Sequence, residues 1–120
     1  MMKKRILVVE DEQDIRAVIR DYFLLENFEV WGAESGLQAL NQLKIRGLPD
    51  IIILDMKMPI MNGWEFAAEF GKVYGRKVPI IVATAAADTE KRAADVQAVD
   101  YIAKPFELDE LLKKVQKHIL

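Results

Sequence analysis

Hydrophobic residues along the chain follow two alternating periods. Short continuous apolar runs, such as "RILVV" at residues 5–9 and "DIIIL" at 50–54, are typical of strands that are covered on both faces. Between such runs, apolar residues recur every three or four positions, as expected of amphipathic helices. The pattern predicts five strands, at residues 5–9, 28–33, 50–54, 78–85 and 100–106. It also predicts five helices, at 12–25, between Ser35 and Gly47, and at 62–73, 88–98 and 107–119.

Local signals support these helix boundaries. Ser35 and Gln38 have the spacing of a capping box, and Gly47 lies where a helix C-terminal glycine is common. The last helix has acidic residues in its first turn and lysines toward its end, which complements the helix dipole. Five strand–helix units with apolar strands predict one α/β domain over residues 1–120. Its parallel sheet would be doubly wound, with helices on both faces.

Composition excludes several classes of protein. The chain has no cysteine, so neither a disulfide framework nor a thiolate metal site is expected. Its apolar runs are far shorter than the ~20 residues that cross a bilayer, and the run after the N-terminal lysines is too short for a signal peptide. A net charge of −2 without a basic stripe argues against direct nucleic-acid binding by this chain. We therefore expect a cytoplasmic protein that does not act on membranes.

Polar residues follow the predicted strands at their carboxyl ends, where open α/β sheets bind ligands. Glu10 and Asp11 follow the first strand, Asp55 the third, Thr84 the fourth and Lys104 the fifth. Each has an ordinary alternative role as a cap, a turn residue or a solvated charge, but their convergence on one edge favours a site. Crowded carboxylates repel unless a hard cation such as Mg²⁺ lies between them. Such a cation, a lysine and a hydroxyl are the groups that stabilise a transferring phosphoryl group.

These motifs resemble those of the response-regulator receiver domain of two-component signalling. The resemblance rests on "VVEDE", "LDMKMPIMNG", "VATA" and "DYIAKPF", which occur in the family's order along essentially the whole chain. It implies a flavodoxin-like strand order, 2-1-3-4-5, and Asp55 as the phosphoacceptor. It further implies that Mg²⁺ (or Mn²⁺) is held by Glu10, Asp11, Asp55 and the backbone carbonyl of Lys57. Thr84, Lys104 and Tyr101 would contact the phosphate or take part in the switch, and the bond before Pro105 would be cis. Lys57 and Ala86 would modulate the rate of phosphate hydrolysis.

The resemblance also implies partners. A histidine kinase or a histidine phosphotransfer protein would donate the phosphoryl group, and the fourth helix, fifth strand and fifth helix would contact a downstream target or effector. A weak homodimer is a further option. The chain departs from the usual pattern in having Glu10 where Asp is frequent. It also has a stretch from Thr84 to Lys104 that is about two residues short and lacks the usual glycine, so the fourth helix is expected to be short or shifted.

Three alternatives differ in testable ways. A haloacid-dehalogenase-like phosphatase would need a second aspartate where the chain has Lys57. A flavodoxin-like electron carrier would need a phosphate-binding loop in place of "EDEQD". A receiver-like interaction module that is never phosphorylated would not need the intact acids, Thr84 and Lys104. His118 is interpreted as a solvated cation at a helix end, and Trp31 and Trp64 as packing residues.

Overall fold

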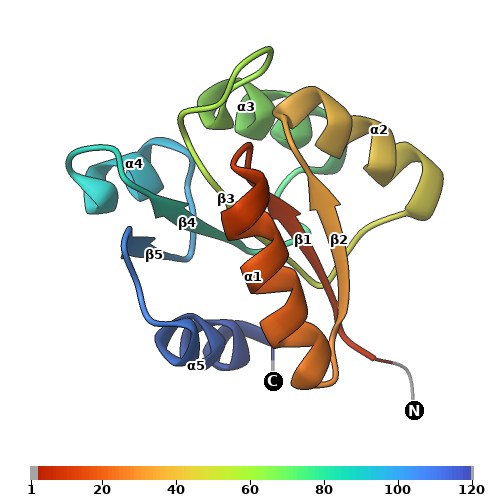
Figure 1. The fold of residues 1–120 in the computed structure, drawn as a ribbon. Coiled ribbons are helices and arrows are strands. Elements are labelled where there is room, and N and C mark those ends of the chain that lie inside the picture. The colour runs from red at the N-terminus through yellow and green to blue at the C-terminus, as the bar shows by residue number, and fades with distance from the viewer. Residues whose placement is uncertain (1–2, 120) are drawn as a thin grey trace.

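The computed structural model describes residues 3–119, which form a single five-stranded parallel sheet with helices on both faces (Figure 1). The strand order is β2-β1-β3-β4-β5, so the predicted fold class and strand order are confirmed. The strands are β1 (Arg5–Val9), β2 (Glu29–Ala33), β3 (Ile51–Leu54), β4 (Ile80–Thr84) and β5 (Asp100–Ala103). The helices are α1 (Gln13–Leu25), α2 (Gly36–Arg46), α3 (Gly63–Tyr74), α4 (Thr89–Asp95) and α5 (Leu108–Ile119).

The sheet separates two hydrophobic cores, which explains why its central strands are apolar throughout. Alternate residues of a strand point to opposite faces. Leu7 and Val9 therefore enter the core that the sheet shares with α2 and α3, whereas Ile6 and Val8 enter the core shared with α1 and α5. All four residues of β3 are buried. Between residues 3 and 119, no helix combines the length and the apolar character needed to cross a membrane.

Side-chain caps fix the starts of α2 and α3. The Ser35 hydroxyl accepts a hydrogen bond from the Gln38 N–H at 3.2 Å, as predicted. The Gln38 side chain does not complete the box, however, and instead accepts from the Glu34 N–H. A complete capping box occurs at α3, between Asn62 and Glu65.

The fourth helix, at seven residues, is shorter than the range 88–98 that the hydrophobic pattern predicted, which confirms the expectation of a short fourth helix. It ends at Asp95 because Gln97 adopts a left-handed conformation (φ 56°) and the Ala98 N–H donates to the Ala93 carbonyl. This is the bonding of a Schellman motif, which usually has glycine at the left-handed position. Because no glycine marks this position, the helical pattern did not show at which residue the helix ends.

The last strand is also shorter than predicted, ending at Ala103. The Lys104 N–H still donates to the Thr84 carbonyl at 3.0 Å, but Pro105 has no N–H with which to continue the ladder. The interpretation of His118 as a solvated cation is wrong. Its Nε2 lies 3.0 Å from Asp100 and its side chain is only 19% exposed, because the end of α5 packs beside the start of β5.

Candidate phosphoacceptor and metal site

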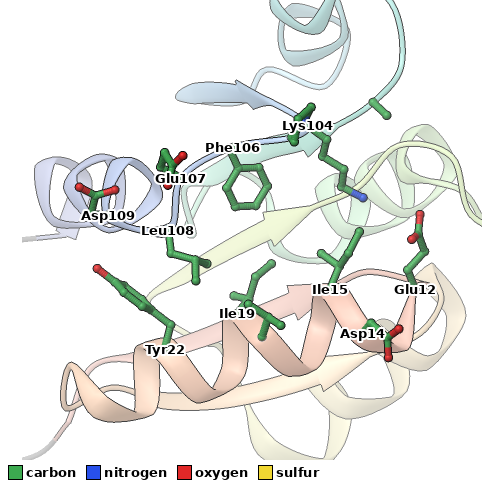
Figure 2. Close-up of a pocket in the computed structure, with 13 residues that line it drawn as sticks. Glu12, Asp14, Ile15, Ile19, Tyr22, Lys104, Phe106, Glu107, Leu108 and Asp109 are labelled. Atoms are coloured by element: carbon green, nitrogen blue, oxygen red, sulfur yellow. The ribbon is translucent and has the colours of Figure 1, made fainter.

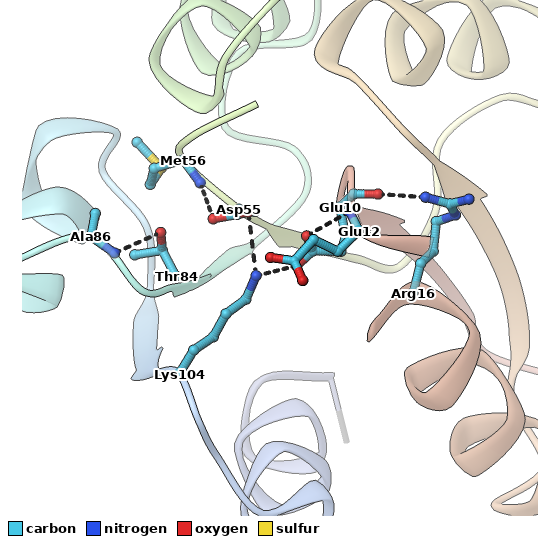
Figure 3. A network of polar contacts seen from close by, with 8 residues as sticks. All are labelled: Glu10, Glu12, Arg16, Asp55, Met56, Thr84, Ala86 and Lys104. Carbon is cyan, nitrogen blue, oxygen red and sulfur yellow. Dashed lines mark hydrogen bonds and ion pairs between the residues drawn. The ribbon is translucent and has the colours of Figure 1, made fainter. Parts of the chain in front are cut away.

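Neighbouring strands deliver the acidic residues to one edge of the sheet, as their sequence positions predicted (Figure 3). Glu10 directly follows β1, and its N–H donates to the Ala33 carbonyl at 2.9 Å. Asp55 directly follows β3, and its N–H donates to the Val9 carbonyl at 2.9 Å. The backbones of both residues therefore continue the sheet ladder and are rigidly held. Each residue is buried, with Glu10 3% and Asp55 6% exposed.

The Asp55 carboxylate is fixed by two donors. Its Oδ1 accepts from the Met56 N–H at 2.7 Å, and its Oδ2 accepts from the Lys104 ammonium at 3.3 Å. Behind it, α3 begins so close to the strand that a Cβ on Gly63 would lie 2.6 Å from the Asp55 carbonyl oxygen. Only glycine allows this close approach, so Gly63 also belongs to the scaffold of the site.

Lys104 joins the two buried carboxylates. Its ammonium forms ion pairs with Glu10 and with Asp55, and its side chain is 12% exposed. The second carboxylate oxygen of Glu10 accepts from the Glu12 N–H at 3.1 Å. One cation thus neutralises part of a cluster of like charges, and it lies where an anion bound at Asp55 would meet it.

Glu10 and Lys104 both have shifted pKa values. Burial raises the pKa of Glu10 to about 7, against the hydrogen bond from Lys104, which lowers it. Burial also acts to lower the pKa of Lys104, but the hydrogen bond to Glu10 and the negative charge of Asp55 outweigh it and raise the pKa. Near neutral pH, Glu10 is therefore partly protonated, whereas Lys104 stays charged.

The acidic residues fit a magnesium ion. Glu10, Asp11 and Asp55 each offer one carboxylate oxygen, and these oxygens lie within 4.8 Å of one another. Mg²⁺ prefers oxygen ligands, few of them from protein, with water completing an octahedron. A dication at this position would favour the charged form of Glu10, against the burial that raises its pKa.

The remaining predicted residues lie around this cluster without completing it. Thr84 ends β4 and is 1% exposed, and its hydroxyl accepts from the Ala86 N–H at 3.2 Å. The Lys57 side chain is exposed. The Lys104–Pro105 peptide bond is cis. Tyr101 on β5 is 37% exposed, with the Lys114 ammonium 5.9 Å from its ring centroid, so its side chain lies outside the pocket.

Arg16 is a supporting residue that the sequence reasoning missed. From the first turn of α1 it donates from Nη1 to the Glu10 carbonyl at 2.8 Å, and its side chain crosses Gly32 of β2. A signal was available, since a cation near a helix N-terminus opposes the helix dipole and suggests a tertiary partner.

An apolar groove of about 780 Å³ adjoins the site between α1 and the start of α5 (Figure 2). Ile15, Val18 and Tyr22 line one side, Phe106 and Leu108 the other, and Lys104 lies where the groove meets the acidic cluster. Val18 is 52% exposed. Four acidic residues also line the groove: Glu12, Asp14, Glu107 and Asp109.

Comparison with known proteins gives a consistent result. A sequence profile of the response regulator receiver domain matches residues 6–116. The chain is 33% identical over 121 residues to sporulation initiation phosphotransferase F of Bacillus subtilis, covering 99% of this chain and 96% of that protein. It is 36% identical over 115 residues to the regulatory protein AtoC of Escherichia coli, covering 94% of this chain but 24% of AtoC.

Solved structures agree with the sequence comparisons. The response regulator TrrA of Thermotoga maritima, crystallised with Mg²⁺ and BeF, matches with a TM-score of 0.83 at 38% identity, covering 95% of this chain and 97% of TrrA. A CheY-like receiver domain protein of Methanospirillum hungatei matches with a TM-score of 0.89 at 26% identity, covering 98% and 94%. With nearly the whole chain matched in sequence and in fold, the chain belongs to the response regulator receiver domain family of two-component signalling.

Proposed function

We propose that Asp55 accepts a phosphoryl group from a phosphohistidine of a donor protein, and that the aspartyl phosphate switches the chain between two conformations. The observation that carries this proposal is the position of the Lys104 ammonium, in contact with both Asp55 and Glu10 at the carboxyl edge of the sheet. A carboxylate oxygen of Asp55 attacks phosphorus, and the bond from phosphorus to the donor's imidazole nitrogen breaks. The imidazole nitrogen keeps the electron pair and takes up a proton from solvent.

Charge at the site decides whether this transfer is feasible. An incoming phosphoryl group brings negative oxygens toward a cluster that already contains Glu10, Asp11 and Asp55. Lys104 offsets part of that repulsion. Mg²⁺, with Mn²⁺ as an alternative, would supply the rest of the neutralising charge. Glu10, Asp11, Asp55 and the Lys57 carbonyl would hold the ion.

The switch follows from contacts that exist in only one state. A phosphorylated Asp55 offers acceptor oxygens to the Lys104 ammonium and to the Thr84 hydroxyl, which would leave its present contact with the Ala86 N–H. Charge-assisted hydrogen bonds contribute about 1.5–3 kcal/mol each. Two or three of them approach the ~5.5 kcal/mol that shifts a two-state equilibrium from 1:99 to 99:1. Tyr101 would then turn inward toward the space that Thr84 leaves.

We assign the output surface to α4, β5 and α5, because Tyr101 lies on this face. A downstream target or effector would distinguish the outward from the inward Tyr101, and a weak homodimer through the same face is a further option. We assign the lifetime of the phosphoryl group in part to Lys57 and Ala86, which follow Asp55 and Thr84 by two residues. Phosphate loss from Lys57→Ala, compared with wild type, tests the first of these assignments.

The groove beside Lys104 suits the donor, a histidine kinase or a histidine phosphotransfer protein. Asp55 is only 6% exposed, so a donor must fit closely over the edge of the sheet. An amphipathic helix would place apolar residues against Ile15, Val18 and Phe106, and basic residues against the acidic side chains of the groove. Val18→Asp should therefore weaken transfer from the donor protein while leaving labelling by a small phosphodonor unchanged.

Intact-mass measurement after incubation with Mg²⁺ and acetyl phosphate tests the proposal. The wild-type chain should gain the mass of one phosphoryl group and Asp55→Asn should not, and omission of Mg²⁺ should abolish the gain. No gain in the wild type would instead favour an interaction module that functions without phosphorylation.

A further inference from the structure

The loop that follows Asp55 carries an unusual residue at its tip. Ile60 has φ 69°, and the Met61 N–H donates to the Pro59 carbonyl across it at 2.7 Å. This is a γ-turn with positive φ, the rarer and more strained of the two γ-turn forms. A β-branched residue is a poor choice there, because its Cβ substituents crowd the backbone in the left-handed region. Ile60 is also 80% exposed, so a large apolar side chain is held in solvent.

The surrounding loop does not need this side chain to fold. The Gly63 N–H donates to the Met56 carbonyl at 2.9 Å and closes the base of the loop. The Met61 carbonyl accepts from the Gly36 N–H at 3.0 Å, and the Met58 and Met61 side chains pack against the core. The loop is therefore anchored on both sides of Ile60. Glycine or asparagine at position 60 would meet the backbone requirement with less strain.

The position of the tip suggests what Ile60 contacts. It lies five residues after Asp55, and the loop is tied to the start of α2, on the α2/α3 face of the sheet. The apolar groove lies on the opposite, α1/α5 face, so Asp55 sits between two apolar features. A protein that delivers a phosphoryl group to the buried Asp55 has to cover the edge from which this loop projects.

We infer that Ile60 is a contact for the phosphodonor protein, opposite the groove, and that it contributes to the choice of donor. The inference rests on the proposed phosphotransfer to Asp55. It assigns no role to Ile60 in the chemistry, so a phosphodonor too small to reach the tip should be insensitive to substitutions there.

The test compares two donors on the same variants. The protein donor is an autophosphorylated histidine kinase selected because it labels the wild-type chain, and the small donor is acetyl phosphate with Mg²⁺. Ile60→Asn and Ile60→Gly should lose at least about tenfold in kcat/KM for the kinase, mainly through KM, as expected when an apolar contact is removed. Ile60→Leu keeps an apolar tip and should retain transfer. All three variants should accept phosphate from acetyl phosphate as the wild type does.

Ile45 supplies a matched control, since it is 83% exposed on α2. Ile45→Asn should change neither reaction. Unaltered transfer from the kinase to Ile60→Asn would overturn the inference and leave a downstream target or a second copy of this chain as the contact. An equal loss with acetyl phosphate would overturn it as well, by placing Ile60 inside the reacting site. Failure of acetyl phosphate to label even the wild type would count against the proposed function instead.

Discussion

Two glycines of the same helix should respond in opposite ways to alanine. Gly63 opens α3, where a Cβ would lie 2.6 Å from the Asp55 carbonyl oxygen and 2.8 Å from the Met56 Cα. Gly71 lies two turns further along, where a Cβ would meet nothing within 4 Å. Gly63→Ala is therefore a steric perturbation aimed at the backbone of Asp55, and Gly71→Ala is its control for helix propensity.

The geometry sets the magnitude. The contact with the Asp55 carbonyl would be about 0.8 Å shorter than ordinary van der Waals contact. Both obstructing groups are backbone, so no side chain can rotate away, and α3 or the strand end must move. Overpacking of this kind costs about 1–3 kcal/mol, and we expect Gly63→Ala to lose about 2–3 kcal/mol. Gly71→Ala should gain about 0.5–1 kcal/mol, because alanine restricts the unfolded chain and favours the helix.

Urea denaturation followed by circular dichroism measures both changes in the free energy of unfolding, and thermal denaturation measures the corresponding shifts in Tm. At roughly 4 °C per kcal/mol for a domain of this size, Tm should fall by about 8–12 °C for Gly63→Ala and rise by about 2–4 °C for Gly71→Ala. Mg²⁺ affinity should also fall for Gly63→Ala alone. Displacement of the Asp55 backbone would also shift the Asp55 carboxylate, which is one of the expected Mg²⁺ ligands. A Gly63→Ala protein as stable as the wild type would refute the reasoning that this close approach is obligatory.

Three further predictions concern charge and strain. Burial acts to raise the pKa of Asp100, but hydrogen bonds from His118, the Tyr101 N–H and Lys114 outweigh it and lower the pKa below its ordinary value of 3.8. Ionised Asp100 therefore stabilises the folded protein fully above pH 3.8, and this stabilisation is lost as the pH falls through the lowered pKa. The free energy of unfolding, measured by urea denaturation at acid pH, should fall more steeply for wild type than for Asp100→Asn. The pKa of Glu10, raised from 4.5 to about 7, makes the metal-free protein less stable as pH rises between these values. Mg²⁺ should therefore raise Tm more at pH 8 than at pH 6, and an equal increase would contradict this. Ile60→Gly should be more stable than wild type by about 0.5–1 kcal/mol in urea denaturation, since relief of left-handed strain exceeds the entropy cost of glycine; a loss of stability would contradict it.

The hydrophobic pattern was sufficient to predict the sheet. β3 is apolar at every position because both faces of a central parallel strand are buried, and that requirement is visible in the sequence. The positions of Glu10 and Asp55 directly after their strands also predicted that they would meet, because parallel strands present their carboxyl ends at the same edge. These predictions succeeded because they depend on local spacing and on the direction of the chain.

What the sequence could not supply depends on contacts between distant residues. The end of α4 at Asp95 is a local exception, because the left-handed residue after it is Gln97 and not the usual glycine. The pairing of His118 with Asp100 requires α5 to pack beside β5. The same holds for the target of Arg16. The position of this cation near the start of α1 suggests a tertiary partner, but the partner is a backbone carbonyl oxygen, which no side-chain pattern identifies. The strain at Ile60 is likewise invisible in "MPIMNG", since it arises from anchors at Gly63 and Gly36. The sequence by itself determined which side chains reach the edge of the sheet. Only the tertiary structure decided that Lys104 joins Glu10 to Asp55 and that burial raises the pKa of Glu10, because desolvation and ion pairing depend on what surrounds a group in space.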